Sequence, residues 1–364
     1  MRKLLYTLAS NTITRMIGTP PYLILFVSDK CTNKCSHCWY NSDWKDENLK
    51  GEILSLDELV KLSKSLHNIR FLTISGGEAF LRDDIEEIVR AFVVNSKVSR
   101  FDIPTSGFDS ELITKKVINI LSQNPNTPFR VDVSLDGTEE LHNNIRHNRH
   151  AFSNALKTIE SLGKIKKENK LFDLSIITTI SDENNHQITE IAELVKQILP
   201  TGEWMVNIIR GNSPGLKISL ATTSAYKQAN EIIAERFSKN DFTGDRGHSL
   251  GKWLTAKNAL RRDMILRTID STRRGGGCAA GCLTAVVLSN GDVRACEMLP
   301  TSFGNLRDHE FDLPKMLASN KGDEIRKEIQ DTECICTHEC NLSVSILMQP
   351  SCWHKLIKNR FLTT

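Results

Sequence analysis

The chain has 364 residues, enough for one large domain and a smaller one, and its 40% hydrophobic and 25% charged residues are typical of a globular protein. A net charge of +3 without a sustained basic face disfavours nucleic acid as a partner. The sequence contains neither an apolar run long enough to cross a bilayer nor a signal peptide at residues 1–14, so we expect a cytoplasmic protein with no membrane partner.

Strand-like and helix-like segments alternate from residue 22 onward. Strands are predicted at residues 22–27, 71–74, 101–103, 129–135, 174–180 and 204–209. Helices are predicted at residues 55–66, 83–94, 111–121, 151–162, 186–199, 225–237 and 252–269, the first opened by a Ser55–Glu58 capping box. Six βα repeats predict an α/β fold, a partial (β/α)6 TIM-like barrel of parallel strands joined by right-handed crossovers.

Polar motifs follow the predicted strands. Residues 31–38 come after the first strand, Gly76-Gly77-Glu78 after the second, Thr105-Ser106-Gly107 after the third, residues 134–137 after the fourth and Arg210-Gly211 after the sixth. In βα barrels the chemistry takes place at the carboxyl ends of the strands. The motifs should therefore meet at one mouth of the barrel.

The ten cysteines fall into two groups. Three lie in one short segment, at Cys31, Cys35 and Cys38. The other seven lie in the last quarter of the chain, at Cys278, Cys282, Cys296, Cys334, Cys336, Cys340 and Cys352. In a reducing compartment, clustered cysteines indicate metal ligands rather than disulfides. The split predicts one cofactor near the N-terminus and a separate cysteine-rich module near the C-terminus.

The N-terminal group offers three closely spaced thiolates with no fourth cysteine nearby. Four thiolates normally close an iron–sulfur or zinc site. Three predict a [4Fe–4S] cluster with one iron open to an outside ligand. A zinc site with His37 as the fourth ligand is the alternative, although His37 directly precedes Cys38 and the geometry would be cramped.

A CxxxCxxC motif directly after the first strand of a βα chain resembles the radical S-adenosylmethionine superfamily. In that family S-adenosylmethionine chelates the open iron, and its reductive cleavage yields a 5′-deoxyadenosyl radical that abstracts a substrate hydrogen. The resemblance implies a flavodoxin- or ferredoxin-type reductant. It also implies that Gly76, Gly77 and Glu78 contact the methionine moiety, and that Ser134 and Arg146 hold its carboxylate or the ribose.

The C-terminal cysteines, with an Asn290-Gly291 hairpin between them, resemble the SPASM domain, a cysteine-rich α+β module that binds auxiliary clusters in this superfamily. By this resemblance Cys278, Cys282, Cys296 and Cys340 ligate a first auxiliary [4Fe–4S] cluster, and Cys334, Cys336 and Cys352 serve a second. The fourth ligand of that second cluster is then His338, Glu333, water or substrate. A single auxiliary cluster, as in the shorter twitch variant, and a zinc ribbon are the alternatives.

The implied reaction is an oxidation, in which an auxiliary cluster accepts an electron from the substrate radical. Such a step needs a base for the departing proton. Glu297 follows Cys296 at a position resembling that of an acidic residue in sulfatase-maturating members, and is the candidate catalytic residue.

The substrate is expected to be a peptide or protein side chain, as in ribosomal peptide or sulfatase-type maturation. A small-molecule dehydrogenase or epimerase acting on a sugar or aminocyclitol is the alternative enzyme. A non-catalytic iron–sulfur or zinc scaffold is the alternative outside catalysis. The expected organisation is an N-terminal extension at residues 1–21, the core barrel at 22–222, bridging helices at 223–274 and the SPASM-like domain at 275–364.

Overall fold

A computed structural model describes residues 2–38, 40, 51–210, 218–238, 251–271, 277–332, 336–346 and 349–362. The sheet consists of β1 (Tyr22–Ser28), β2 (Phe71–Gly76), β3 (Phe101–Thr105), β4 (Phe129–Ser134), β5 (Phe172–Ile180), β6 (Glu203–Ile208), β7 (Thr284–Val287), β8 (Asp292–Arg294) and β9 (Ser302–Asn305). The helices of the barrel region are α3 (Leu56–Ser65), α4 (Ile85–Ser96), α5 (Ser110–Gln123), α6 (Glu139–Arg146), α7 (Ala151–Glu168), α8 (Ile188–Ile198) and α9 (Leu220–Ser238).

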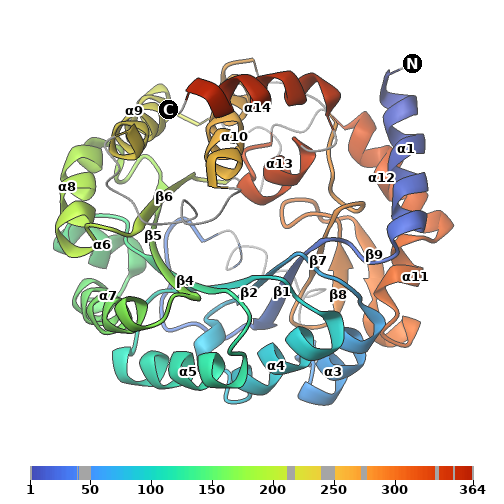
Figure 1. The fold of residues 1–364 in the computed structure, drawn as a ribbon, viewed down its shortest axis with the longest axis horizontal. Coiled ribbons are helices and arrows are strands. Elements are labelled where there is room, and N and C mark those ends of the chain that lie inside the picture. Colours follow the sequence, from blue (N-terminus) through green and yellow to red (C-terminus); the bar gives the residue numbers. More distant parts are fainter. Residues whose placement is uncertain are drawn as a thin grey trace.

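The first six strands form a curved parallel sheet in the order β6-β5-β4-β3-β2-β1, with helices on its outer side (Figure 1). This confirms the predicted partial barrel. The predicted strands and helices are present with small shifts at their ends, and Ser55 and Glu58 form the predicted capping box.

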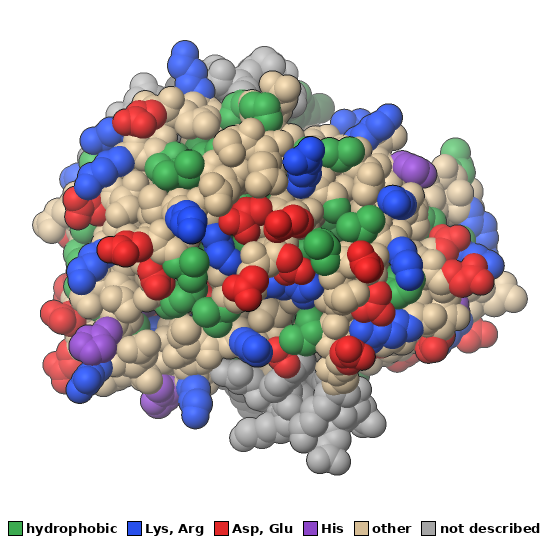
Figure 2. All heavy atoms as spheres, turned by 90° about the horizontal axis from the view of Figure 1, so that it is seen from below, with side chains coloured by type: hydrophobic (Ala, Val, Ile, Leu, Met, Phe, Trp, Pro, Cys, Tyr) green, Lys and Arg blue, Asp and Glu red, His purple; other side chains and the backbone are tan. Residues whose placement is uncertain are grey.

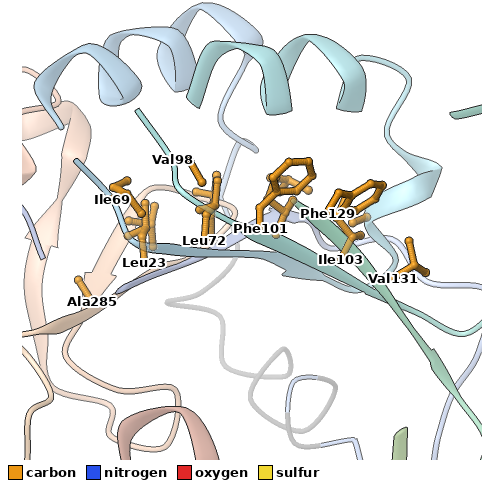
Figure 3. Packing of buried hydrophobic residues seen from close by; sticks show 14 of the residues in the cluster. Leu23, Ile69, Leu72, Val98, Phe101, Ile103, Phe129, Val131 and Ala285 are labelled. Atoms are coloured by element: carbon orange, nitrogen blue, oxygen red, sulfur yellow. The ribbon is translucent and has the colours of Figure 1, made fainter. Parts of the chain in front are cut away.

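Apolar side chains on the outer face of the sheet pack against the surrounding helices and form the main core. Leu72, Phe101, Ile103, Phe129 and Val131 point toward the helices from adjacent strands (Figure 3). Alternate residues of these strands face the barrel interior. The outer face therefore supplies the main apolar core, and the inner face carries a smaller apolar cluster at β1 and β7 beside polar groups.

The C-terminal region continues the barrel sheet. β7 pairs in parallel with β1, and β8 and β9 follow as antiparallel strands. The predicted Asn290-Gly291 turn joins β7 to β8, with Gly291 at φ 90°. The sequence did not predict the β1–β7 pairing, and the domain boundaries stay predictions.

The helices at residues 2–17, 139–146, 339–345 and 350–362 were not predicted from the sequence, whereas a helix between Leu306 and Cys334 was expected and is present. The remaining helices are α1 (Arg2–Ile17), the predicted α10 (Gly251–Ser271), α11 (Leu313–Leu317), α12 (Asn320–Asp331), α13 (Glu339–Ser345) and α14 (Pro350–Leu362). α11 and α12 pack against β9, whereas α13 and α14 pack against α10. α1 packs against α12 near one end of the sheet (Figure 1). Arg326 on α12 fixes this contact by donating to Asn11 and to the carbonyl of Gly281.

The outer face over the barrel helices, seen from below in Figure 2, carries interspersed acidic and basic side chains with scattered apolar ones. Among the described residues on this face, charges of one sign do not form a continuous field. In the part of the chain that the structure describes, each helix is too short or too polar to cross a bilayer.

Candidate metal centre and active site

The N-terminal cysteines lie in a loop that leaves the carboxyl end of β1. Cys31 is exposed, whereas Cys35 and Cys38 are half-buried. Although Cys31 is exposed as a residue, the groups around its thiol displace part of the water and raise the pKa of that thiol to about 11, and the nearby Cys35 and Cys38 act in the same direction. The three thiols are thus neighbours, although among the described residues they are not gathered at metal-ligand distance.

The Gly76-Gly77-Glu78 motif supports the base of this loop. Gly77 N donates to Ser28 O at 2.8 Å, and Glu78 N donates to Lys30 O at 2.7 Å. A Cβ on Gly76, whose φ is 133°, would lie 2.2 Å from Ser28 O, and one on Gly77 would lie 2.3 Å from Lys30 O. Both glycines are therefore required by the close approach of two backbones.

The Glu78 carboxylate joins the ends of β2 and β3. It accepts from the Thr105 hydroxyl at 2.9 Å and from the backbone and hydroxyl of Ser106, each at 2.9 Å. Burial raises the pKa of Glu78, and these hydrogen bonds oppose the rise. Glu78 lies at the predicted mouth, and its contact with a bound ammonium stays a prediction.

The opposite side of the cysteine loop rests on the end of α6. Lys34 N donates to Arg146 O at 3.3 Å, and Ser36 N donates to Ile145 O at 2.9 Å. The Arg146 guanidinium also donates to Cys35 Sγ at 3.5 Å. The sequence singled out Arg146 but not the helix that carries it or its contact with a predicted cluster ligand.

A buried ion pair fixes the position of Arg146. Its Nε donates to Asp136 Oδ2 at 2.7 Å, and the other oxygen of Asp136 accepts from Thr179 N at 2.9 Å. Burial disfavours the Asp136 carboxylate, but Arg146, His37, His142 and the Thr179 N–H together outweigh it and lower the pKa of Asp136 to about 2. Asp136 is thus more than a turn residue. Ser134 ends β4 beside it, and the predicted contacts of Ser134 and Arg146 with S-adenosylmethionine stay predictions.

Two buried polar atoms at the cysteine loop could form hydrogen bonds with a bound ligand. Asp29 Oδ1 and His37 Nδ1 are buried and have no hydrogen-bond partner among the described residues. Buried polar groups are normally satisfied, so these two leave room for partners on a ligand. Together with three thiols, they fit an iron–sulfur cluster with a polar ligand on its open iron. The protein would hold that cluster through Cys31, Cys35 and Cys38.

Some of the C-terminal cysteines lie close together in the structure, and others do not. Cys296 lies near Cys278 and Cys336, whose charges raise its pKa in addition to the larger effect of burial. Cys282 instead donates to Ser10 O on α1 at 3.3 Å. Cys352 is buried on α14. Cys334 and Glu333 lie outside the described residues, so the predicted second ligand set stays a prediction.

Two of these sulfurs accept hydrogen bonds. Asn341 Nδ2 donates to Cys296 Sγ at 3.2 Å, and Met298 N donates to the same sulfur at 3.4 Å. The Tyr22 hydroxyl donates to Cys340 Sγ at 3.1 Å. Donors aimed at sulfur stabilise the thiolate form that binds iron. Cys296 and Cys340 therefore fit the predicted role of cluster ligands.

A buried group of charges joins the end of β6 to the segments that carry Cys296 and Cys340. Arg210 donates to Glu297 at 3.2 Å and also pairs with Glu339. Glu297 pairs in addition with His338, and these partners lower the pKa of Glu297 despite the opposing effect of burial. The Glu297 carboxylate is thus held in place by Arg210 and His338, and its role as catalytic base stays a prediction. The His338 side chain pairs with Glu297, and its predicted role as a cluster ligand also stays a prediction.

Two family models match this chain. The model for the radical SAM superfamily matches residues 25–195, and the model for the SPASM iron–sulfur cluster-binding domain matches residues 278–341. The first range contains the cysteine loop and the motifs from Gly76 to Arg146. The second contains the C-terminal cysteines from Cys278 to Cys340.

Curated relatives span most of the chain at low identity. AlbA of Bacillus subtilis, an antilisterial bacteriocin subtilosin biosynthesis protein, is 23% identical over 292 residues, which cover 79% of this chain and 57% of AlbA. The chain thus spans little more than half of that relative. An AdoMet-dependent heme synthase of Methanosarcina barkeri is 25% identical over 306 residues, covering 81% of this chain and 82% of the synthase.

A solved structure of Streptococcus suis SuiB bound to its precursor peptide SuiA has the same fold. Its TM-score is 0.60 at 16% identity, and the match covers 94% of this chain and 76% of SuiB. At this identity the likeness establishes the fold alone.

The contact of Gly77 with the cysteine loop predicts that Gly77→Ala displaces the loop. We expect the variant to bind less iron after anaerobic reconstitution than the wild type and to yield little 5′-deoxyadenosine. Gly163→Ala is the matched control, because a Cβ there has open space in α7 and alanine favours a helix. Iron and 5′-deoxyadenosine at wild-type levels in Gly77→Ala would contradict this account of the loop.

Loss of the Arg210 guanidinium leaves the buried Glu339 carboxylate without the cation that it pairs with, and leaves Glu297 with His338 as its remaining partner. Arg210→Met should therefore lower the free energy of unfolding by about 3–5 kcal/mol, measured by urea denaturation of the cluster-free protein. Arg267→Met, which removes an exposed pair with Asp263, should cost no more than about 1 kcal/mol. Equal losses of unfolding free energy in the two variants would show that the buried pairs of Arg210 stabilise the fold no more than an exposed ion pair does.

Proposed function

Because this chain belongs to the radical SAM superfamily and carries a SPASM iron–sulfur domain, we propose that it oxidises a peptide or protein side chain. It is a radical SAM enzyme whose cofactors are S-adenosylmethionine, the superfamily's [4Fe–4S] cluster and auxiliary iron–sulfur clusters. The bound cofactors supply a hydrogen-abstracting radical and an electron acceptor. The chain's own residues orient these groups and the substrate.

One observation supports an oxidation that uses both cluster sites. Cys38 and Cys340, which are far apart in the sequence, pack against the same small group of buried side chains on the inner side of the sheet. That group consists of Ile24, Phe26, Tyr40, Val286 and Leu288. The first site would start the reaction, and the second would accept the electron across this shared apolar wall.

The inner wall also favours a reaction shielded from water. Ile24, Phe26, Val286 and Leu288 are each at most 2% exposed. A reactive radical survives only where water and competing hydrogen donors are excluded. The apolar wall would provide this exclusion between the two sites.

Relatives support a peptide as the substrate class. AlbA and the sporulation killing factor maturation protein SkfB of Bacillus subtilis are both named for peptide products. The structure of SuiB contains a bound precursor peptide. We infer that this chain likewise acts on a peptide or protein side chain, by forming a crosslink, a thioether or a formylglycine.

A small molecule is the second candidate substrate. The match with the heme synthase covers most of this chain and most of the synthase, whereas the match with AlbA covers little more than half of AlbA. A tetrapyrrole substrate, or the sugar substrate considered from the sequence, would use the same radical initiation. The substrate would then be taken up without a peptide-recognition surface.

The function is tested with enzyme that has been reconstituted anaerobically, reduced, and supplied with S-adenosylmethionine and peptides encoded by neighbouring genes. We expect 5′-deoxyadenosine together with a peptide that has lost hydrogen, detected by mass spectrometry. Cys31→Ala should form neither product. Turnover of a tetrapyrrole or sugar with no peptide modified would contradict the peptide proposal, and a failure to cleave S-adenosylmethionine would favour the scaffold.

Counting iron distinguishes one auxiliary cluster from two. A chain with the first cluster and two auxiliary clusters binds about twelve iron atoms, and a chain with one auxiliary cluster binds about eight. We propose two auxiliary clusters, because Cys336 and Cys352 add buried thiols beyond the first predicted ligand set.

A further inference from the structure

A polar layer lies on the inner face of the barrel near the amino ends of its strands. Thr73 on β2 is in register with Asp102 on β3, and Asp102 is in register with Arg130 on β4. Their chain neighbours Leu72 and Phe101 point the other way, into the helices (Figure 3). Thr73 and Asp102 therefore face the interior, and Asp102 is buried.

Hydrogen bonds connect this layer to a predicted cluster ligand. The Tyr22 hydroxyl lies 3.1 Å from Cys340 Sγ and 2.9 Å from Thr73 Oγ1. Thr73 Oγ1 lies 3.1 Å and 3.2 Å from the two carboxylate oxygens of Asp102. A continuous path thus runs from a carboxyl group through two hydroxyls to a sulfur.

The number of hydrogens on this path decides where each bond points. Each hydroxyl has one hydrogen to donate, and an ionised carboxylate can only accept. When Asp102 is ionised, Thr73 donates to it, and the free lone pairs of Thr73 Oγ1 compete with Cys340 for the hydrogen of Tyr22. When Asp102 is protonated, it can donate to Thr73, which donates to Tyr22, and the hydrogen of Tyr22 points at Cys340.

We propose that Asp102 is a proton switch for the hydrogen bond between Tyr22 and Cys340, and thereby sets the reduction potential of the auxiliary cluster that Cys340 ligates. The proposal rests on the predicted ligation by Cys340. Hydrogen bonds to the sulfurs of a cluster stabilise its more negative reduced form and raise its potential. Protonated Asp102 therefore gives the higher potential, and ionised Asp102 the lower one.

The surroundings of Asp102 place the switch near neutral pH. Burial, followed by the Asp132 carboxylate, raises the pKa of Asp102 to about 7, and Arg130 opposes the rise. By linkage, an electron added beside Cys340 favours proton uptake at Asp102. The charged and titratable groups around Asp102 are Arg100, Arg130, Asp132 and Tyr22, and Arg130 is itself paired with Glu203.

The switch is tested by redox titration of the reconstituted full chain, monitored by EPR without substrate, between about pH 6 and about pH 8.5. The wild-type auxiliary potential should fall as pH rises, by at most about 59 mV per pH unit, the one-electron equivalent of a tenfold change. Tyr22→Phe should have a lower potential at low pH and lose the dependence. It keeps the ring that packs against Phe71.

Two further variants separate the steps of the path. Thr73→Val leaves Tyr22 with only Cys340 to donate to, so its potential should stay high and independent of pH. Asp102→Asn carries a permanent donor toward Thr73 and should behave in the same way. Asp132→Asn is the matched control, because loss of its charge should move the inflection to lower pH without removing it.

Three results would overturn the proposal. An unchanged potential and slope in Tyr22→Phe would show that Tyr22 does not tune the cluster. An unchanged slope in both Thr73→Val and Asp102→Asn would exclude the switch. Unchanged iron content and auxiliary EPR signal in Cys340→Ser would exclude Cys340 as a ligand, a failure of the predicted site rather than of the switch. Thermal unfolding of each cluster-free variant verifies that it is folded.

Discussion

β1 pairs with β2 on one side and with β7 on the other, and these two pairings join the barrel to the C-terminal region. Tyr22 is in register with Phe71 on β2 and with Thr284 on β7. The cysteine loop leaves the carboxyl end of β1, and Tyr22 at its amino end reaches Cys340. One strand therefore fixes where both predicted cluster sites lie, although more than two hundred residues separate their cysteines in the sequence.

The polar contacts of the site divide into two kinds. Backbone pairing at Gly77 and the buried pair of Asp136 with Arg146 hold the cysteine loop in place. Hydroxyl and amide donors at Cys296 and Cys340 instead act on the sulfurs themselves. The first kind determines whether a cluster can be bound, and the second kind determines how readily the bound cluster accepts an electron.

Local patterns in the sequence predicted the barrel strands, the capping box and the hairpin turn, because each depends on residues close in the chain. They did not predict α6, a short polar helix that packs against α7 and is tied to Asp136 through His142 and Arg146. They also missed the β1–β7 pairing, which joins strands from opposite ends of the chain. The hydrogen-bonded path from Asp102 through Thr73 and Tyr22 to Cys340 was missed because it depends on which side chains meet inside the barrel.

The central claim is that the N-terminal cysteines bind a cluster separate from the auxiliary site. It is tested most directly by iron analysis and EPR of the Cys31→Ala/Cys35→Ala/Cys38→Ala variant with and without S-adenosylmethionine. We expect a loss of about four iron atoms, an auxiliary signal that persists, and no spectral response to S-adenosylmethionine. An unchanged iron content, or a signal that still responds to S-adenosylmethionine, would contradict it.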